Sequence, residues 1–140
     1  MKHFITGLLL LSSLSTIAAP FHVEPTDSIR LIPEGSYIEF TKDFNVKPVL
    51  DAHLLGNSKR IRCWMVTNVS SKDRVIKAGT KIEIRFLDMY YPRFSTPKDE
   101  KIKNIYCSNP VTEDRELLVG EFEDAIKSVA KLVMSEPVEF

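Results

Sequence analysis

The chain has 140 residues, a formal net charge of zero, 44% hydrophobic residues and 27% charged residues. This length leaves room for one compact domain, and the composition is that of a globular protein, which argues against general disorder. The zero net charge argues against a nucleic-acid partner held by bulk electrostatics.

The first residues are typical of a secretory signal peptide. A short basic start precedes an apolar stretch from Phe4 to Ile17, and small residues follow at Ala18 and Ala19. This order suits signal peptidase, and we predict cleavage after Ala18. The apolar stretch is short and interrupted for a membrane span, and we expect no integral membrane segment after cleavage. The expected organisation is a signal peptide over residues 1–18, an N-terminal arm over 19–28 and a single domain over 29–140.

Export bears directly on the two cysteines of the chain. In a compartment that permits disulfides, Cys63 and Cys107 are expected to form one bond. Neither belongs to a Cys-x-x-Cys motif, so thioredoxin-type exchange has no support. A metal site would need further ligands, whereas His22 and His53 are isolated in the sequence. We therefore expect a structural disulfide, no metal and no cofactor.

Strand patterns dominate the middle of the chain. The segment Arg60–Asn68 is rich in β-branched and aromatic residues, and alternation places Cys63 and Trp64 on opposite faces. Residues 41–58 are expected to form a loop with a short helical turn, and residues 90–100 a long loop. The remaining predicted elements are a short extended run, a turn and a strand within 29–40, a strand-rich segment over 74–89 and a strand over 101–109.

A short internal similarity supports a β fold. The segments Ile32–Phe40 and Ile76–Ile84 align without a gap and share an isoleucine, a glycine, a small hydroxylated residue and the pair Ile-Glu. We expect each glycine to form a turn and each strand to point its apolar residues inward. The two segments are either copies of a duplicated binding element or two hairpins that use the same type of turn. Two copies are too few for a repeat array.

In the final third of the chain, the spacing of hydrophobic residues changes from that of a strand to that of a helix. Leu118, Phe122, Ile126, Val129 and Val133 recur at the three- and four-residue spacing of an amphipathic helix. Thr112 is the expected N-cap, with acidic residues in the first turn, and Pro137 the expected stop.

The best candidate for a partner-binding surface is the loop that contains Tyr90, Tyr91, Arg93 and Phe94, because aromatic residues and arginine are enriched at interfaces. The alternative is that its aromatic side chains cap the core. Trp64 shares its face with Arg60 and Arg62, and this face either forms a platform for a flat or anionic group or lies beneath the C-terminal helix. The partner-binding candidates are Tyr90, Tyr91, Arg93, Phe94, Trp64 and Arg62.

The basic and acidic residues are unevenly distributed. Basic residues prevail between Lys59 and Arg85, and acidic residues prevail from Thr112 to the end of the chain. Two interpretations remain open: a basic sheet face that binds an acidic partner, or a helix and a sheet that neutralise each other within one molecule.

Motifs of catalysis are absent from the sequence. His53 follows Asp51 by two residues, which is weak evidence for a base and its orienting carboxylate. Nucleophile-elbow, phosphate-loop and metalloprotease motifs do not occur. We expect an α+β domain, a small, mostly antiparallel β-barrel or sandwich of about five strands with a C-terminal amphipathic helix. Its expected role is that of a periplasmic or secreted non-catalytic binding protein of the bacterial envelope, with a protein or another envelope component as partner. The alternative is a structural subunit of an envelope or secretion assembly.

Overall fold

The structure, a computed structural model, describes residues 22–47, 50–68, 73–87, 92–99, 101–108 and 116–136. The expected signal peptide at 1–18, the expected N-cap Thr112 and the loop residues Tyr90 and Tyr91 lie outside the described residues.

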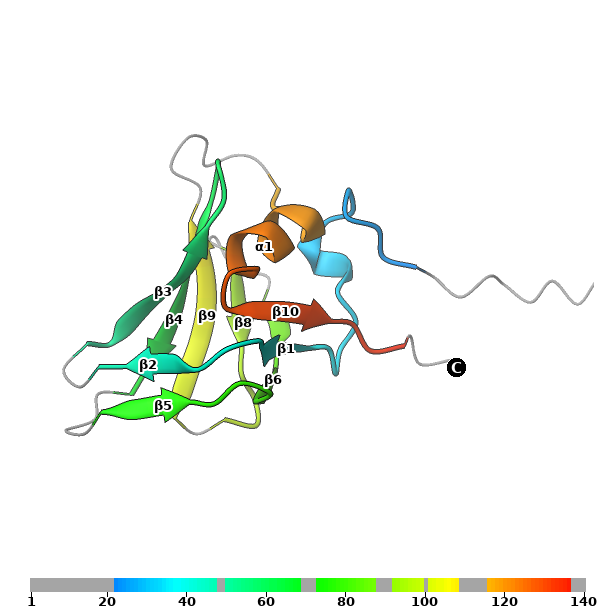
Figure 1. The fold of residues 1–140 in the computed structure, drawn as a ribbon. Helices are drawn as coiled ribbons and strands as arrows, with labels where there is room; N and C mark the ends of the chain where they lie inside the picture. The colour runs from blue at the N-terminus through cyan, green and yellow to red at the C-terminus, as the bar shows by residue number, and fades with distance from the viewer. Residues whose placement is uncertain are drawn as a thin grey trace, which may run out of the picture.

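Short antiparallel strands are the main regular structure of the described chain (Figure 1). The elements in chain order are a 3-10 helix η1 (Ile29–Leu31), β1 (Tyr37–Phe40), β2 (Phe44–Val46), β3 (Ala52–Asn57), β4 (Arg62–Thr67), β5 (Arg74–Ile76), β6 (Lys81–Glu83), β7 (Arg85–Leu87), β8 (Arg93–Ser95), β9 (Ile102–Ser108), α1 (Val119–Ile126) and β10 (Ala130–Val133). They form a five-stranded sheet in the order β3-β4-β9-β8-β7, a three-stranded sheet in the order β10-β1-β6 and the pair β2-β5.

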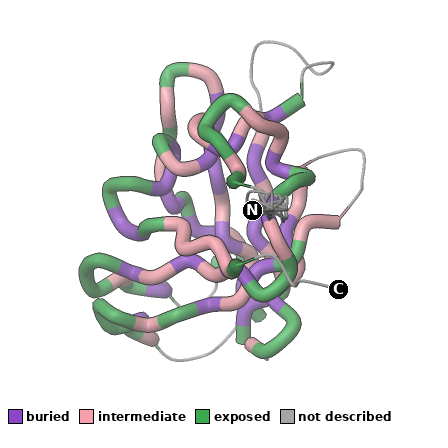
Figure 2. The backbone as a smooth tube through the Cα atoms, turned by 90° about the vertical axis from the view of Figure 1, so that its right-hand side faces the viewer, coloured by how far each residue is buried: buried purple, intermediate pink, exposed green. Residues whose placement is uncertain are grey.

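A mostly antiparallel β fold with one α-helix is what the sequence predicted. The described strands do not close into a barrel, however, and they are shorter and twice as many as expected. The layering is sandwich-like, with buried positions alternating with half-buried and exposed ones along the backbone (Figure 2).

The core lies between the two larger sheets and α1. The three-stranded sheet contributes Ile38 and Phe40, and the five-stranded sheet contributes Met65 and Phe94, all fully or almost fully buried. Phe122 of α1 stacks on Phe94, with 4.8 Å between ring centroids. Burial of apolar side chains of this size is the main favourable contribution to folding.

The chain passes from one sheet to the other at Ile84, between β6 and β7. The Ile84 N–H donates to the Ser36 carbonyl at 2.9 Å and so extends the pairing of β6 with β1. The next residue, Arg85, already pairs with Ser95 of β8. A bent strand of this kind makes the corner where two sheets meet.

The internal similarity has a structural counterpart. Gly35 and Gly79 both have positive φ, of 91° and 87°, as the turn interpretation required. Ile38 pairs directly with Ile82, its counterpart 44 positions later. The same separation, 44 residues, joins Cys63 to Cys107, which pair directly across β4 and β9. The sequence similarity is confined to 32–40 and 76–84, so only Ile38 and Ile82 are equivalent residues that pair with each other.

The predicted long C-terminal helix is wrong in its extent. The described helix α1 is confined to Val119–Ile126, and its first turn is held by the Leu118 N–H, which donates to the Glu121 carboxylate at 3.1 Å. Ala130–Val133 instead forms β10, which pairs with β1 along its whole length. A segment of four residues has little local preference of its own, so pairing with β1 overrides the helical period.

Two other segments also differ from the expectation. The region 41–58 contains strands β2 and β3 instead of a helical turn, and β8 lies within the expected loop 90–100. Residues 29–31 form a 3-10 turn instead of an extended run. The described part of the arm is anchored, because Gly120 N–H and Val119 N–H of α1 donate to the carbonyls of Pro25 and Asp27, each at 2.9 Å.

Candidate binding surface

The outer face of the five-stranded sheet carries the strongest candidate site. Strand register places one row of side chains across all five strands, namely Leu54, Trp64, Tyr106, Arg93 and Leu87. A second row beside it consists of Ala52, Val66, Asn104, Ser95 and Arg85. Directly opposed side chains in neighbouring strands are about 5 Å apart at Cβ, so each row is a chain of neighbours. We call these two rows, with Arg62 and Ser108, the Trp64 face.

Helix α1 does not cover the Trp64 face. Trp64 alternates with Cys63 and Met65, which are fully buried on the inner side of β4. The helix packs on that inner side, where Phe122 stacks on Phe94 and a Cβ added at Gly56 would lie 2.1 Å from the Ala125 carbonyl oxygen. The interpretation in which the C-terminal helix packs over Trp64 is therefore wrong, because α1 lies on the opposite side of the sheet. Trp64 itself is half-buried by its neighbours.

The Trp64 face is basic. Its charged residues are Arg62, Arg85 and Arg93, and its two described rows contain no carboxylate. Arg85 is ion-paired with Glu34. Positive charge without a facing carboxylate attracts an anionic group.

Two polar atoms of the same face have no partner. Among the described residues, Arg93 Nε and Asn104 Oδ1 are buried and make no hydrogen bond. A buried polar group without a partner costs about 1–3 kcal/mol, and such atoms are uncommon in folded proteins. One unsatisfied donor and one unsatisfied acceptor therefore lie just beneath the face, on the adjoining strands β8 and β9.

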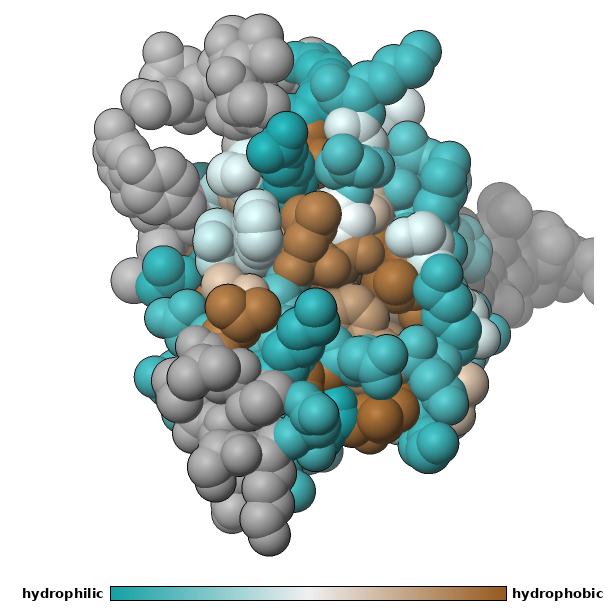
Figure 3. All heavy atoms as spheres, turned by 60° about the vertical axis from the view of Figure 1, so that its left-hand side comes forward, coloured by the Kyte–Doolittle hydropathy of each residue, from teal (hydrophilic) through white to brown (hydrophobic). Residues whose placement is uncertain are grey.

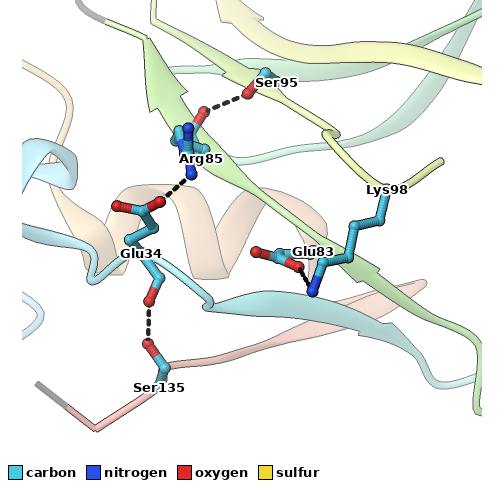
Figure 4. Close-up of polar contacts among 6 residues, drawn as sticks. All are labelled: Glu34, Glu83, Arg85, Ser95, Lys98 and Ser135. Atoms are coloured by element: carbon cyan, nitrogen blue, oxygen red, sulfur yellow. Dashed lines mark hydrogen bonds and ion pairs between the residues drawn. The ribbon is translucent and has the colours of Figure 1, made fainter. Parts of the chain in front are cut away.

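The outer face of the three-stranded sheet is different, because its charges are already paired. Lys131 contacts Glu39 at 3.0 Å, and the Lys81 ammonium lies 5.2 Å from the Tyr37 ring centroid. Glu83 is paired with Lys98 at 2.8 Å (Figure 4). This sheet thus has little unsatisfied charge with which to hold a partner.

The sheet corner is tied by polar contacts as well. Glu34 pairs with Arg85, and its carbonyl accepts a hydrogen bond from the Ser135 hydroxyl at 2.7 Å (Figure 4). The Ser95 hydroxyl donates to the Arg85 carbonyl at 3.4 Å. These contacts link β7 and β8 to the segment after β10, so they are structural.

The structure excludes Phe94 from the expected binding loop and leaves the rest of that loop untested. Phe94 is 0% exposed and belongs to β8, where it packs against Phe86 and Phe122. It cannot contact a partner, because alternation turns it toward the core. Arg93, its neighbour on the outer side, remains a candidate, whereas Tyr90 and Tyr91 lie outside the described residues.

One contact bears on the uneven charge distribution. Arg60, which precedes β4, forms an ion pair with Glu121 of α1 at 3.5 Å. This pair neutralises sheet against helix, while Arg62 and Arg93 point to the other side of the sheet. The intramolecular interpretation therefore holds for Arg60, whereas binding of an acidic partner by Arg62 and Arg93 stays a prediction.

His53 is a structural residue at the junction of β2 and β3. It is 7% exposed, its Nε2 accepts a hydrogen bond from the Lys47 N–H at 3.1 Å, and its ring lies edge-on to Phe44. With Nε2 occupied, the ring is poorly placed to act as a base for a substrate. Within the described ranges, no group of three or more His, Cys, Asp or Glu side chains is arranged to hold a metal.

The edge strand β3 exposes apolar residues. Leu54 is 44% and Leu50, just before the strand, 48% exposed. Hydrophobic residues gather among hydrophilic ones on the side of the molecule where β2, β3 and β5 lie in Figure 1 (Figure 3). Exposed apolar side chains beside a free strand edge are a feature of association surfaces.

Of the residues on the Trp64 face, the sequence indicated Trp64, Arg62 and Arg93 as binding candidates but not Tyr106 and Asn104. The two missed residues can be located from the disulfide, because it fixes the register of β4 and β9. If Cys63 is paired directly with Cys107, antiparallel register puts Trp64 opposite Tyr106. Alternation alone does not select this register, so the two aromatic residues seemed unrelated.

Comparison with protein-family models, curated proteins and solved structures finds no match to this chain. Among the described residues, no helix has both the length and the apolar character needed to cross a membrane. The site must therefore be interpreted from its own geometry.

Proposed function

We propose that this chain is an exported, non-catalytic binding protein of the bacterial envelope that holds its partner on the Trp64 face. The observation that carries the proposal is the row in which Trp64, Tyr106 and Arg93 lie side by side on three adjacent strands. Tryptophan, tyrosine and arginine are the residues that contribute most to binding energy at interfaces.

Export is supported by two features. The N-terminal sequence is typical of a signal peptide, and a disulfide joins Cys63 to Cys107 with an S–S distance of 2.05 Å. Disulfides persist in oxidising compartments such as the periplasm or the exterior. A partner in the envelope is the simplest consequence of that location.

A non-catalytic role is favoured because the described residues do not combine the groups that catalysis needs. His53 is engaged with a backbone N–H. The polar residues of the Trp64 face are arginine, asparagine, serine and tyrosine, which bind and orient but supply no general base near neutral pH.

The test is affinity capture from the native envelope with matched tyrosine variants. Tyr106 and Tyr37 are both half-buried and each occupies the central strand of its sheet on the outer side. We expect Tyr106→Ala, alone or with Trp64→Ala, to reduce recovery of the partner while Tyr37→Ala leaves it unchanged. Equal recovery by all variants, with thermal unfolding confirming that each is folded, would remove the Trp64 face from the function.

A structural subunit is the second candidate. The observation in its favour is that β3 and β10 are edge strands, and that Leu54 is exposed on β3. An open edge can pair with a strand of another copy. Sedimentation over a range of concentrations tests this role. Leu54 also belongs to the Trp64 face, so self-association that Leu54→Lys abolishes and Tyr106→Ala leaves unchanged would favour a subunit. A monomer at all concentrations would exclude it.

A further inference from the structure

We propose that the ligand held by the Trp64 face is an anionic glycan chain, lying across the strands of the five-stranded sheet. This inference rests on the proposed function and names the chemistry of the ligand. It follows from the shape of the face, from its aromatic and polar side chains and from the sign of its charge.

The face is elongated. The row from Leu54 to Leu87 crosses five strands. Neighbouring strands are about 4.8 Å apart, so the row extends over roughly 19 Å perpendicular to the strands. Its two aromatic residues, Trp64 and Tyr106, are adjacent near its middle. A linear ligand with several repeating units fits such a row better than a compact molecule does.

The polar side chains of the face suit hydroxyl groups. Arg93 and Asn104 are half-buried, with Arg93 Nε and Asn104 Oδ1 turned away from solvent. Their other side-chain N–H groups are donors, and a hydroxyl accepts from such donors as well as donating. A sugar ring also presents an apolar C–H face that packs on an aromatic ring, next to a rim of hydroxyls. Trp64 and Tyr106 supply the rings, and Ser95 and Ser108 add further hydroxyl partners to the same face.

A peptide is a poorer fit. Extended peptides bind sheets by adding a strand at an edge, where backbone N–H and C=O groups are free. On the Trp64 face the backbone groups of β4, β9 and β8 are used in the ladder between strands. A large protein interface is also disfavoured, because Leu54 is the one described residue of the face among the exposed large hydrophobics.

The charge of the face selects an acidic glycan. Arg62 is exposed and Arg93 is half-buried, and no carboxylate belongs to the described rows. Because Arg85 is already paired with Glu34, Arg62 and Arg93 are the cations available to a ligand. Charge-assisted hydrogen bonds from arginine to a carboxylate are about twice as strong as neutral ones, so uronic acid units would be preferred over neutral sugars.

The experiment uses Trp64 as its own reporter, since it is the one tryptophan in the sequence. The purified mature protein is titrated with an oligogalacturonate, with its methyl ester and with poly-L-glutamate of matched charge, while tryptophan emission is followed. We expect the oligogalacturonate to change the emission and the ester to bind about tenfold more weakly, as expected for loss of a charge-assisted contact. Poly-L-glutamate should not bind measurably.

Variants assign the contacts. Arg93→Gln and Tyr106→Ala should each weaken oligogalacturonate binding about tenfold, while Tyr37→Ala should not change it. If poly-L-glutamate binds as tightly as the oligogalacturonate, charge alone is recognised. If the methyl ester binds as tightly, charge is not used. Either result overturns the proposal. If neither oligogalacturonate nor the acidic polysaccharide of the native envelope binds, the assignment of the ligand as an anionic glycan is wrong. Continued partner capture that depends on Tyr106 would then leave the proposed function intact, whereas capture independent of Tyr106 would remove both.

Discussion

Cys63 and Cys107 lie directly opposite each other in β4 and β9, with 4.1 Å between their Cα atoms. The bond therefore holds the register of the two strands that carry the candidate site. A slip of one residue would exchange the inner and outer faces of β4 and turn Trp64 toward the core. Stability and the placement of Trp64 beside Tyr106 thus depend on the same covalent link.

Removal of the disulfide should destabilise the domain strongly. The bond spans 44 residues, and in the chain-entropy model a loop of that length contributes about 4 kcal/mol. We expect the double variant Cys63→Ala/Cys107→Ala to lose an amount of this order in urea unfolding. Recovery of wild-type protein from an oxidising compartment with both thiols alkylatable would refute the structural role of the pair.

The inner and outer sides of β8 should respond very differently to truncation. Phe94 is fully buried between Phe86 and Phe122, so Phe94→Ala should cost about 3–5 kcal/mol of unfolding free energy. Ser95 lies on the outer side, and Ser95→Ala should change stability by about 0.5 kcal/mol or less. Similar losses in chemical unfolding would mean that the orientation of β8 is misassigned.

Glycine is required at two positions for different reasons, at Gly56 because a side chain would clash and at Gly79 because of the backbone conformation. A Cβ at Gly56 would lie 2.1 Å from the Ala125 carbonyl oxygen, whereas a Cβ at Gly79 meets nothing within 4 Å. Gly56→Ala should displace α1, at a cost of about 1–3 kcal/mol. Gly79→Ala should cost about 1–2 kcal/mol through its positive φ alone. Amide chemical shifts of α1 should move in the first variant and stay unchanged in the second.

Asp43 should make stability depend on pH. The Ala78 N–H, at 2.9 Å, and the Lys77 ammonium hold the pKa of Asp43 below its ordinary value. Because the pKa is lowered in the folded state, the stabilisation is present above the unfolded-state pKa and is lost as the pH falls through the folded value. Asp43→Asn should therefore be less stable than wild type near about pH 7, and the difference should shrink toward about pH 3. Urea midpoints at both pH values check this, and a pH-independent difference would contradict the assignment.

The sequence predicted β4 and β9 because both alternate over six or more residues and contain β-branched or aromatic residues. It predicted the disulfide because the expected export leaves two cysteines in an oxidising compartment. It missed β2 and β8, each of three residues, because such strands show too few alternations to be distinguished from loops. It missed the six-residue β3 because that strand has no β-branched residue and its register shifts between Leu54 and Gly56. It extended the helix into β10 because Val129 and Val133 continue the helical spacing, while pairing with β1 is a long-range effect.

The candidate site was predictable only in part. Composition pointed to Trp64, Arg62 and Arg93, yet their relation to Tyr106 and Asn104 depends on register across three strands. Phe94 was misassigned because its neighbours in sequence resemble a binding loop, whereas its burial is decided by alternation within β8.

Site-specific photo-cross-linking in the native envelope shows whether a partner is held on the Trp64 face. The photoreactive residue replaces one tyrosine at a time, as Tyr106→p-benzoylphenylalanine or, as the control on the other sheet, Tyr37→p-benzoylphenylalanine. We expect a light-dependent adduct at position 106 and none at position 37. An adduct at position 37 with none at position 106 would contradict it.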